Sequence, residues 1–159
     1  MNEYVKNSGF KLDAFDRAIL NLVQQENKRP HSEIGNLVGL SESAVRRRLA
    51  VLREEGVISR DVSLLSPSSF GVTLIVQISF LKDSVEAYEA FDHQMENLPN
   101  VRQSYHVSGS SDYILVVHGP SLQWYEDWAK SNIMSNANIG RHETAVAWSC
   151  KKFETAISV

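Results

Sequence analysis

The sequence lacks the features that mark disulfide-bonded, metal-bound and membrane-spanning proteins. It has one cysteine, Cys150, among 159 residues, which excludes an internal disulfide framework and any multi-cysteine metal site. We expect this thiol to be buried and structural, in a reducing compartment. Apolar runs such as VTLIV at residues 72–76 are too short to span a bilayer, and the charged N-terminus lacks an apolar signal-peptide core. The sequence therefore predicts a cytoplasmic protein without a membrane partner.

Motifs for catalysis and metal binding are also lacking. The sequence has no glycine-rich phosphate loop and no paired carboxylates, and its five histidines show no HExxH spacing. His106 and His118 fall on strands that we expect to be adjacent, where they could lie near each other as ordinary polar residues. We therefore predict no catalytic residue, no metal and no cofactor, and a binding protein is favoured over an enzyme.

Charge is distributed unevenly along the chain, whose net charge is -3 and whose pI is about 5.9. Ten lysines and arginines oppose nine acidic residues through Leu65, a balance of +1, whereas six oppose ten thereafter, a balance of -4. An asymmetry of this kind is typical of a nucleic-acid-binding half joined to a more acidic one, although an excess of one charge is weak evidence alone.

The first part of the chain, to about Gly56, has a helical period. Asp13 is a candidate N-cap of a helix that NKRP (27–30) ends, and Ser41 is a candidate N-cap of a later helix to about Glu55. Between them HSEIGNLV predicts a short helix, with Gly39 just past its end and Gly35 where the next helix crosses. The expected inward residues are Leu12, Phe15, Ile19, Leu22, Val23, Ile34, Leu37 and Val38. Three helices of this kind predict a helix-turn-helix domain, or a three-helix bundle that binds nothing.

After Gly56 the period changes to two. DVSLL (61–65) predicts a strand and SPSSFG (66–71) a linker. Strands are expected at 72–81, 101–109, 112–119 and 141–153, with helices at 84–98 and 121–134. Val85, Tyr88, Phe91, Met95 and Leu98 are the expected inward residues of the first of these helices, and Trp124 and Trp128 those of the second. The order βαββαβ predicts an α+β chain whose second half is a ferredoxin-like sandwich with an antiparallel sheet.

Three consecutive arginines lie on the third predicted helix. Because successive residues turn by roughly 100°, Val45, Leu49 and Leu52 form the buried stripe and Arg47 lies opposite. In a major groove, Ser43 and Arg47 would face base edges, since arginine is the commonest reader of guanine. Arg46 and Arg48 flank the stripe and would extend toward phosphates.

Two alternatives accompany this interpretation of the triplet. Arg48 lies nearest the core, so it could instead cover apolar neighbours with its stem or pair with a carboxylate such as Glu55. The whole triplet could also be a solvated helix face. Against the second alternative, SESAVRRRLA contains only one acidic residue, Glu42, which suits the first turn of a helix.

These residues resemble a known family. LDAFDRAIL, GLS, the paired arginines and LREEGVI, followed by LPNV and VSGSSDYILVV, are similar to Lrp/AsnC transcriptional regulators over 12–153, nearly the whole chain. The resemblance implies a winged-helix-like helix-turn-helix domain (1–60, motif about 31–50), a hinge strand and linker (61–71), and an ACT-like effector-binding and oligomerisation domain (72–159). It also implies double-stranded DNA as a partner and a homo-oligomer, a dimer or an octamer.

The resemblance assigns site residues by position, except that Arg46 stands where the family more often has an apolar or aromatic residue and is included because of the helix geometry above. The expected DNA-binding residues are Ser32, Ser41, Ser43, Ala44, Arg46, Arg47 and Arg48. The expected contacts of an amino-acid effector are Val107, Ser108, Gly109, Ser110, Asp112, Tyr113 and Thr144. Asp112 would accept a bond from the ammonium group, and the open N–H groups of the turn would hold the carboxylate.

The effector assignment has an alternative, because SGSSD is also an ordinary hairpin turn. Ser110 and Ser111 stand where the family commonly has an acidic and an aromatic residue. The expected function is a DNA-binding regulator that responds to an amino acid. The alternatives are an architectural DNA-binding protein without an effector and the regulatory module of an enzyme.

Overall fold

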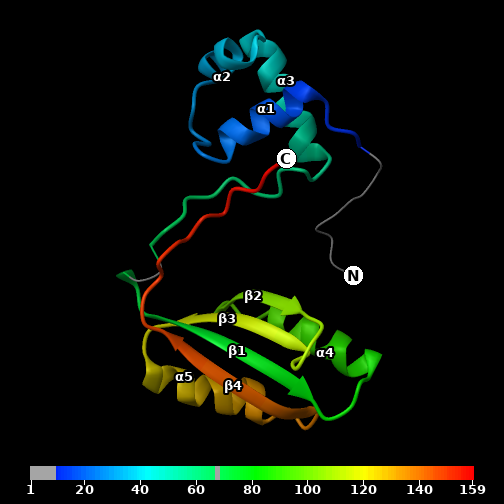
Figure 1. The fold of residues 1–159 in the computed structure, drawn as a ribbon, viewed down its shortest axis with the longest axis vertical. Coiled ribbons are helices and arrows are strands. Elements are labelled where there is room, and N and C mark those ends of the chain that lie inside the picture. The colour runs from blue at the N-terminus through cyan, green and yellow to red at the C-terminus, as the bar shows by residue number, and fades with distance from the viewer. Residues whose placement is uncertain (1–9, 67–68) are drawn as a thin grey trace. The chain divides into compact units, whose positions relative to one another are not determined.

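The computed structural model describes residues 10–66 and 69–159 (Figure 1). The described chain forms two compact units. A helical unit contains the residues up to Leu64 together with Phe153–Val159, and a sheet unit contains Leu65–Lys152. The predicted domain bounds remain a prediction, and they differ from the compact units because they place residues 153–159 with the sheet. Residues 67–68 of the predicted linker lie outside the described residues.

The helical unit consists of α1 (Ala14–Val23), α2 (His31–Val38) and α3 (Glu42–Glu54). Asp13 caps α1 in a capping box with Asp16, and Ser41 caps α3 by accepting a bond from the amide of Ala44. Gly39 ends α2 with φ of 75°, a backbone conformation that glycine adopts without strain. The core of the unit consists of Ile19, Ile34, Val45 and Leu49. The predicted helix-turn-helix arrangement is confirmed.

Two residues of this unit that were expected to face inward are exposed. Phe15 is 42% exposed, because Leu20 takes its place in the core and the Phe15 ring lies under the guanidinium of Arg48, 5.4 Å from it. Leu37 is 58% exposed. Helix α2 buries Gly35 beside Ile34, and a residue two positions after Gly35 lies about 200° around the helix, on the opposite side.

Gly35 is required by the turn between α2 and α3. A Cβ atom at this position would lie 2.4 Å from the carbonyl oxygen of Leu40, which belongs to the turn. The amide of Leu40 also donates to the carbonyl of Gly35 at 2.9 Å. The sequence predicted a small residue here because of the crossing helix, whereas the closest atom belongs to the turn that starts it.

The sheet unit contains β1 (Val72–Phe80), α4 (Val85–Glu96), β2 (Val101–His106), β3 (Tyr113–Gly119), α5 (Leu122–Ala129), a π-helical turn η2 (Lys130–Met134) and β4 (Ile139–Ala147). Its strands lie in the order β2-β3-β1-β4 and all pair antiparallel (Figure 1). The alternate residues Leu74, Val76 and Ile78 of β1 pack against Phe91 of α4 and Trp128 of α5. The predicted ferredoxin-like order is confirmed, with one face of the sheet covered by helices.

Several local predictions for this part of the chain are wrong. Residues 61–65 are not part of a strand, and Val62 and Leu64 are exposed. Val85 at the first turn of α4 is exposed, while Ala87 is buried in its place. The last strand ends at Ala147, so Cys150 follows it and is exposed rather than buried.

The two sheet histidines do not meet. His106 is opposite Tyr113 at one end of β3, where its ring stacks on the tyrosine ring with 4.8 Å between centroids. His118 lies near the other end of β3, within hydrogen-bond distance of the hydroxyl of Thr73 (3.1 Å). Adjacent strands therefore carry them, but the antiparallel register places them at opposite ends of the ladder.

Candidate DNA-binding surface and sensor turn

Helix α3 separates a buried face from a polar one. Val45, Leu49 and Leu52 are fully buried, whereas Ser43 and Arg47 on the opposite face are exposed. Arg47 makes no hydrogen bond or ion pair with any residue that the structure describes. An exposed guanidinium without an intramolecular partner retains all its donors for an external acceptor.

Arg46 is held weakly. Its guanidinium lies 3.3 Å from the carboxylate of Glu42, one turn earlier on α3, and the two side chains are 65% and 55% exposed. Pairs of this kind contribute little to stability because water screens them and both side chains lose freedom. Arg46 is therefore available to exchange Glu42 for another anion.

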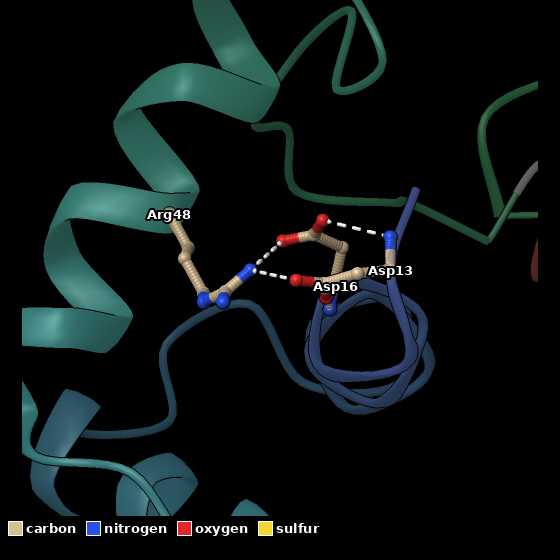
Figure 2. Close-up of polar contacts among 3 residues, drawn as sticks. All are labelled: Asp13, Asp16 and Arg48. Carbon is tan, nitrogen blue, oxygen red and sulfur yellow. Dashed lines mark hydrogen bonds and ion pairs between the residues drawn. The ribbon is translucent and has the colours of Figure 1, made fainter. Parts of the chain in front are cut away.

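Arg48 belongs to a network with α1. Its Nη1 donates to Asp13 at 2.8 Å and to Asp16 at 2.7 Å, as Figure 2 shows. The two aspartates form the capping box of α1, since each carboxylate accepts a bond from the backbone amide of the other, at 2.8 and 3.1 Å. We call Asp13, Asp16 and Arg48 the arginine clamp. It joins the start of α1 to the middle of α3.

Burial gives the arginine clamp its strength. Asp16 is 6% exposed and is the one buried charged residue in the described chain, and the side chain of Arg48 is 27% exposed. The bond from the amide of Asp16 lowers the pKa of Asp13 below its usual 3.8, partial desolvation opposes that shift, and Arg48 lowers the pKa further. The same contacts with the aspartates, Asp16 first, raise the pKa of Arg48.

The other predicted DNA-binding residues are placed as follows. Ser32 is exposed on α2, Ser41 is the cap of α3 with its hydroxyl 3.1 Å from that of Ser43, and Ala44 is partly buried. Arg48 pairs with carboxylates, which was one of the alternatives to a phosphate contact. Its partners are Asp13 and Asp16 in place of the suggested Glu55. The sequence signal was the pair of acids three residues apart at the start of the first helix. The spacing of these acids does not indicate that they would bind Arg48, which lies 32 to 35 positions later.

The sensor turn, residues 107–112, joins β2 to β3. Gly109 has φ of 139°, and no atom of the described residues lies within 4 Å of its Cβ position, so the turn is open there and needs glycine's backbone freedom. Bonds to β1 hold the rest of the turn in place. The amide of Asp112 donates to the carbonyl of Ile78 at 2.8 Å, and the hydroxyl of Ser79 donates to the carbonyl of Ser110 at 3.3 Å.

Asp112 has intramolecular partners. One of its oxygens accepts a bond from the amide of Phe80 at 2.7 Å, and the other lies 3.3 Å from the hydroxyl of Tyr88. That hydroxyl also donates to Asp83 at 2.9 Å. Asp83, burial and Asp112 together raise the pKa of Tyr88 to about 12. Asp112 is therefore partly buried and oriented by contacts within the protein.

Thr144 and Tyr113 do not line the turn. Thr144 is opposite Val76 on the β4 side of β1, with its hydroxyl 2.6 Å from that of Tyr125, whereas Asp112 lies on the β3 side. Tyr113 is buried, and its hydroxyl has no hydrogen-bond partner among the described residues. Burial raises the pKa of Tyr113, and the nearby carboxylate of Asp92 raises it further.

The structure instead forms a small polar hollow beside the turn, with a volume of about 50 Å³. Its lining residues are Gln77, Ser79, Ser110, Ser111, Arg141 and Glu143. Only Ser110 was predicted. Ser111 belongs to the same turn. The other four alternate along β1 and β4 on the sheet face away from the helices, a placement that depends on the register of the two strands. A larger hollow of about 520 Å³ lies apart from these residues, between residues 81–86 and the pair Ala137 and Asn138.

Two classes of feature are missing from the described part of the chain. No group of three or more histidine, cysteine, aspartate or glutamate side chains is placed to hold a metal ion among these residues. None of the helices described here combines the length and the apolar character that crossing a bilayer needs.

Comparisons with known proteins agree with this geometry. The model of the AsnC-type helix-turn-helix domain matches residues 12–53, and that of the Lrp/AsnC ligand binding domain matches residues 73–157. The chain is 33% identical to an HTH-type transcriptional regulator of Sinorhizobium fredii, over 99% of this chain and 94% of the relative. It is 30% identical to the leucine-responsive regulatory protein of Klebsiella pneumoniae, over 76% and 74%.

Solved structures give the same result. An AsnC family transcriptional regulator from Agrobacterium tumefaciens has a TM-score of 0.83 and 31% identity, covering 92% of this chain and 96% of that one. AsnC of Escherichia coli, at 19% identity, shares the fold with a TM-score of 0.81, over 92% and 99%. The chain therefore belongs to the Lrp/AsnC family, and it is a transcriptional regulator that joins an AsnC-type helix-turn-helix domain to a ligand-binding domain.

Proposed function

We propose that this regulator binds specific DNA sequences through α3 and that a small effector, an amino acid, controls its DNA binding or its assembly. The observation that carries the proposal is the exposed pair of Ser43 and Arg47 opposite a fully buried stripe on α3. Relatives named the leucine-responsive regulatory protein and the glutamate uptake regulatory protein, at 30% and 33% identity, support an amino acid as the effector class.

The three arginines have different roles in this proposal. Arg47 has no partner among the described residues and reads a base edge, for which a guanidinium and guanine O6 and N7 are matched. Arg46 leaves its exposed pair with Glu42 to contact a phosphate. Arg48 is occupied by Asp13 and Asp16 and positions α3 without touching DNA.

The effector site is proposed at the sensor turn and its polar hollow. At about 50 Å³ the hollow of one chain is much smaller than the few hundred cubic ångströms of typical ligand pockets. A second copy of the chain would have to complete it, so ligand binding and assembly would be coupled. An effector that prefers one assembly then shifts the spacing of the helical units that bind DNA. This spacing affects DNA binding because half-sites recur about one helical turn apart.

Arg47→Ala is expected to weaken binding to a DNA fragment that the wild-type protein selects from a random pool. The loss should be about fivefold to 150-fold, the equivalent of the roughly 1–3 kcal/mol that a bidentate arginine–guanine contact contributes to discrimination. Binding to a scrambled fragment should change far less, because a base reader adds little to non-specific affinity. Fluorescence anisotropy titrations on both fragments give the two constants.

Arg46→Ala is the matched control on the neighbouring position. It should weaken binding to both fragments similarly and reduce the salt slope by about one, as loss of one phosphate contact predicts. Equal effects of the two substitutions on both fragments would contradict the assignment of Arg47 as the base reader.

Asp112→Asn is expected to remove stabilisation by an amino acid while it preserves the fold. Asparagine keeps an acceptor for the amide of Phe80 but has no negative charge for an ammonium group. A thermal-shift screen of the twenty amino acids on the wild type should find a ligand that adds about 2.7 kcal/mol at a hundred times its Kd. The variant should lose that gain.

Glu89→Gln is the control, since it neutralises an exposed carboxylate on α4 that makes no hydrogen bond or ion pair with any described residue of the turn. A preserved response in Asp112→Asn would contradict the effector site at this turn. If no amino acid stabilises the wild type, the architectural alternative without an effector is favoured instead.

A further inference from the structure

The chain passes between its two units twice. It leaves the helical unit after Leu64 and returns to it at Phe153. In the sheet unit these passages start side by side, because Thr73 at the start of β1 pairs with Ala147 at the end of β4 (Figure 1). The linker before β1 and the segment after β4 therefore leave the sheet from neighbouring strands at the same end.

The returning segment, which we call the C-terminal strap (153–159), is bound to the end of α1. The side-chain amide of Gln24 accepts a bond from the amide of Ile157 at 2.8 Å and donates to the carbonyl of the same residue at 3.0 Å. Gln24 thus satisfies both backbone groups of Ile157, as a peptide group of a neighbouring strand would. Glu154 orders the strap locally by accepting bonds from the amides of Thr155 and Ala156 at 3.0 and 3.1 Å.

The segment that leads out of the helical unit is also bound near the end of α1. Asp61 accepts a bond from Nε of Arg53 at 2.9 Å and one from the side chain of Asn27 at 3.2 Å. The bond from Arg53 lowers the pKa of Asp61 despite partial burial. Asn27 follows Gln24 by three residues, at the corner between α1 and α2. We call Gln24 and Asn27 the α1 corner, since each holds one of the two passages.

We infer that the α1 corner is the docking surface for the chain's own C-terminal strap, and that this contact converts a single flexible connection into a double one. A helical unit that is joined to the sheet unit by one linker can rotate about that linker. Two passages that are attached at neighbouring points at both ends restrict this rotation. Fewer orientations of the helical unit raise the effective concentration of a second helical unit at its half-site. That last consequence rests on the proposed DNA binding, whereas the contact itself does not.

Hydrogen exchange on the full-length protein tests the contact without DNA. Gln24→Ala should accelerate exchange of the Ile157 amide by about fivefold or more, because a protecting hydrogen bond is lost. Gln25→Ala is the matched control, since Gln25 is exposed and its side chain makes no hydrogen bond with any of the described residues. Equal exchange in the wild type and both variants would overturn the docking of the strap.

Segmental rotation tests the double connection. A fluorophore on the single cysteine of an Asn36→Cys, Cys150→Ser protein reports rotation of the helical unit through time-resolved anisotropy. Adding Gln24→Ala, or deleting 153–159, should introduce a faster decay component that adding Gln25→Ala does not. An unchanged decay after deletion would overturn the double connection.

A DNA titration separates this inference from the proposed function. Deletion of 153–159 should weaken binding to a selected fragment with two half-sites about threefold to tenfold, the loss expected from a lower effective concentration. Binding to a fragment with one half-site should not change. Loss of equal size on both fragments would overturn the role of the strap in pairing the helical units. Absence of DNA binding by the wild type would refute the proposed function and leave the exchange result standing.

Discussion

Gly35→Ala is expected to lower the free energy of unfolding of the helical unit by about 2–3 kcal/mol, the upper part of the range for overpacking a tight site. The new Cβ atom would lie 2.4 Å from the carbonyl oxygen of Leu40, and a backbone atom cannot move aside as a side chain can. Any shift of the turn would also stretch the bond from the amide of Leu40 to the carbonyl of Gly35. Urea unfolding of the full chain, followed by circular dichroism at helical wavelengths, measures the loss.

Gly39→Ala is the matched control, four residues later in the same motif. Gly39 has φ of 75°, but nothing in the described part of the chain lies within 4 Å of its Cβ position, so the cost there is backbone strain alone. That strain is about 1–2 kcal/mol. Only Gly35→Ala should also displace the start of α3, so it should reduce DNA binding more than Gly39→Ala does. A milder effect at Gly35 than at Gly39 would contradict the close contact with the turn.

The sequence predicted those parts of the fold that depend on neighbouring residues. Caps are local, so Asp13 and Ser41 marked the starts of α1 and α3 correctly. Alternation of apolar residues predicted β1 and β3, and the order of elements then left few ways to assemble the sheet. The helical period likewise placed Val45, Leu49 and Leu52 in the core and Arg47 opposite it.

Features that depend on distant residues were not predictable in the same way. A helical wheel gives the direction of Arg48 but not what lies there, and its partners come from another helix. The polar hollow needs Ser79 and Arg141 to be opposite each other across two strands, which only the register decides. Thr144 was assigned to the turn by position in the family, and in this chain it faces Tyr125 instead.

Asp16→Ala is expected to lower the free energy of unfolding by about 2–3 kcal/mol and to weaken DNA binding, although Asp16 belongs to α1. The substitution leaves Arg48 without its more buried partner and removes half of the capping box. Fully buried pairs cost about 3–5 kcal/mol when broken, and the partial exposure of Arg48 reduces that figure. Glu42→Ala, which breaks the exposed pair of Arg46, is the control and should change stability hardly at all.

Salt dependence then distinguishes the two roles that the sequence allowed for Arg48. If Arg48 positions α3 through the arginine clamp, Asp16→Ala and Arg48→Met should weaken DNA binding by similar factors and leave the salt slope unchanged. The double variant should bind little more weakly than either single variant, because both substitutions remove the same contact. If Arg48 contacted a phosphate directly, Arg48→Met alone would reduce the salt slope by about one, and Asp16→Ala would free the guanidinium and strengthen binding. Since both Asp13 and Asp16 hold the guanidinium within 2.8 Å, we expect the first pattern.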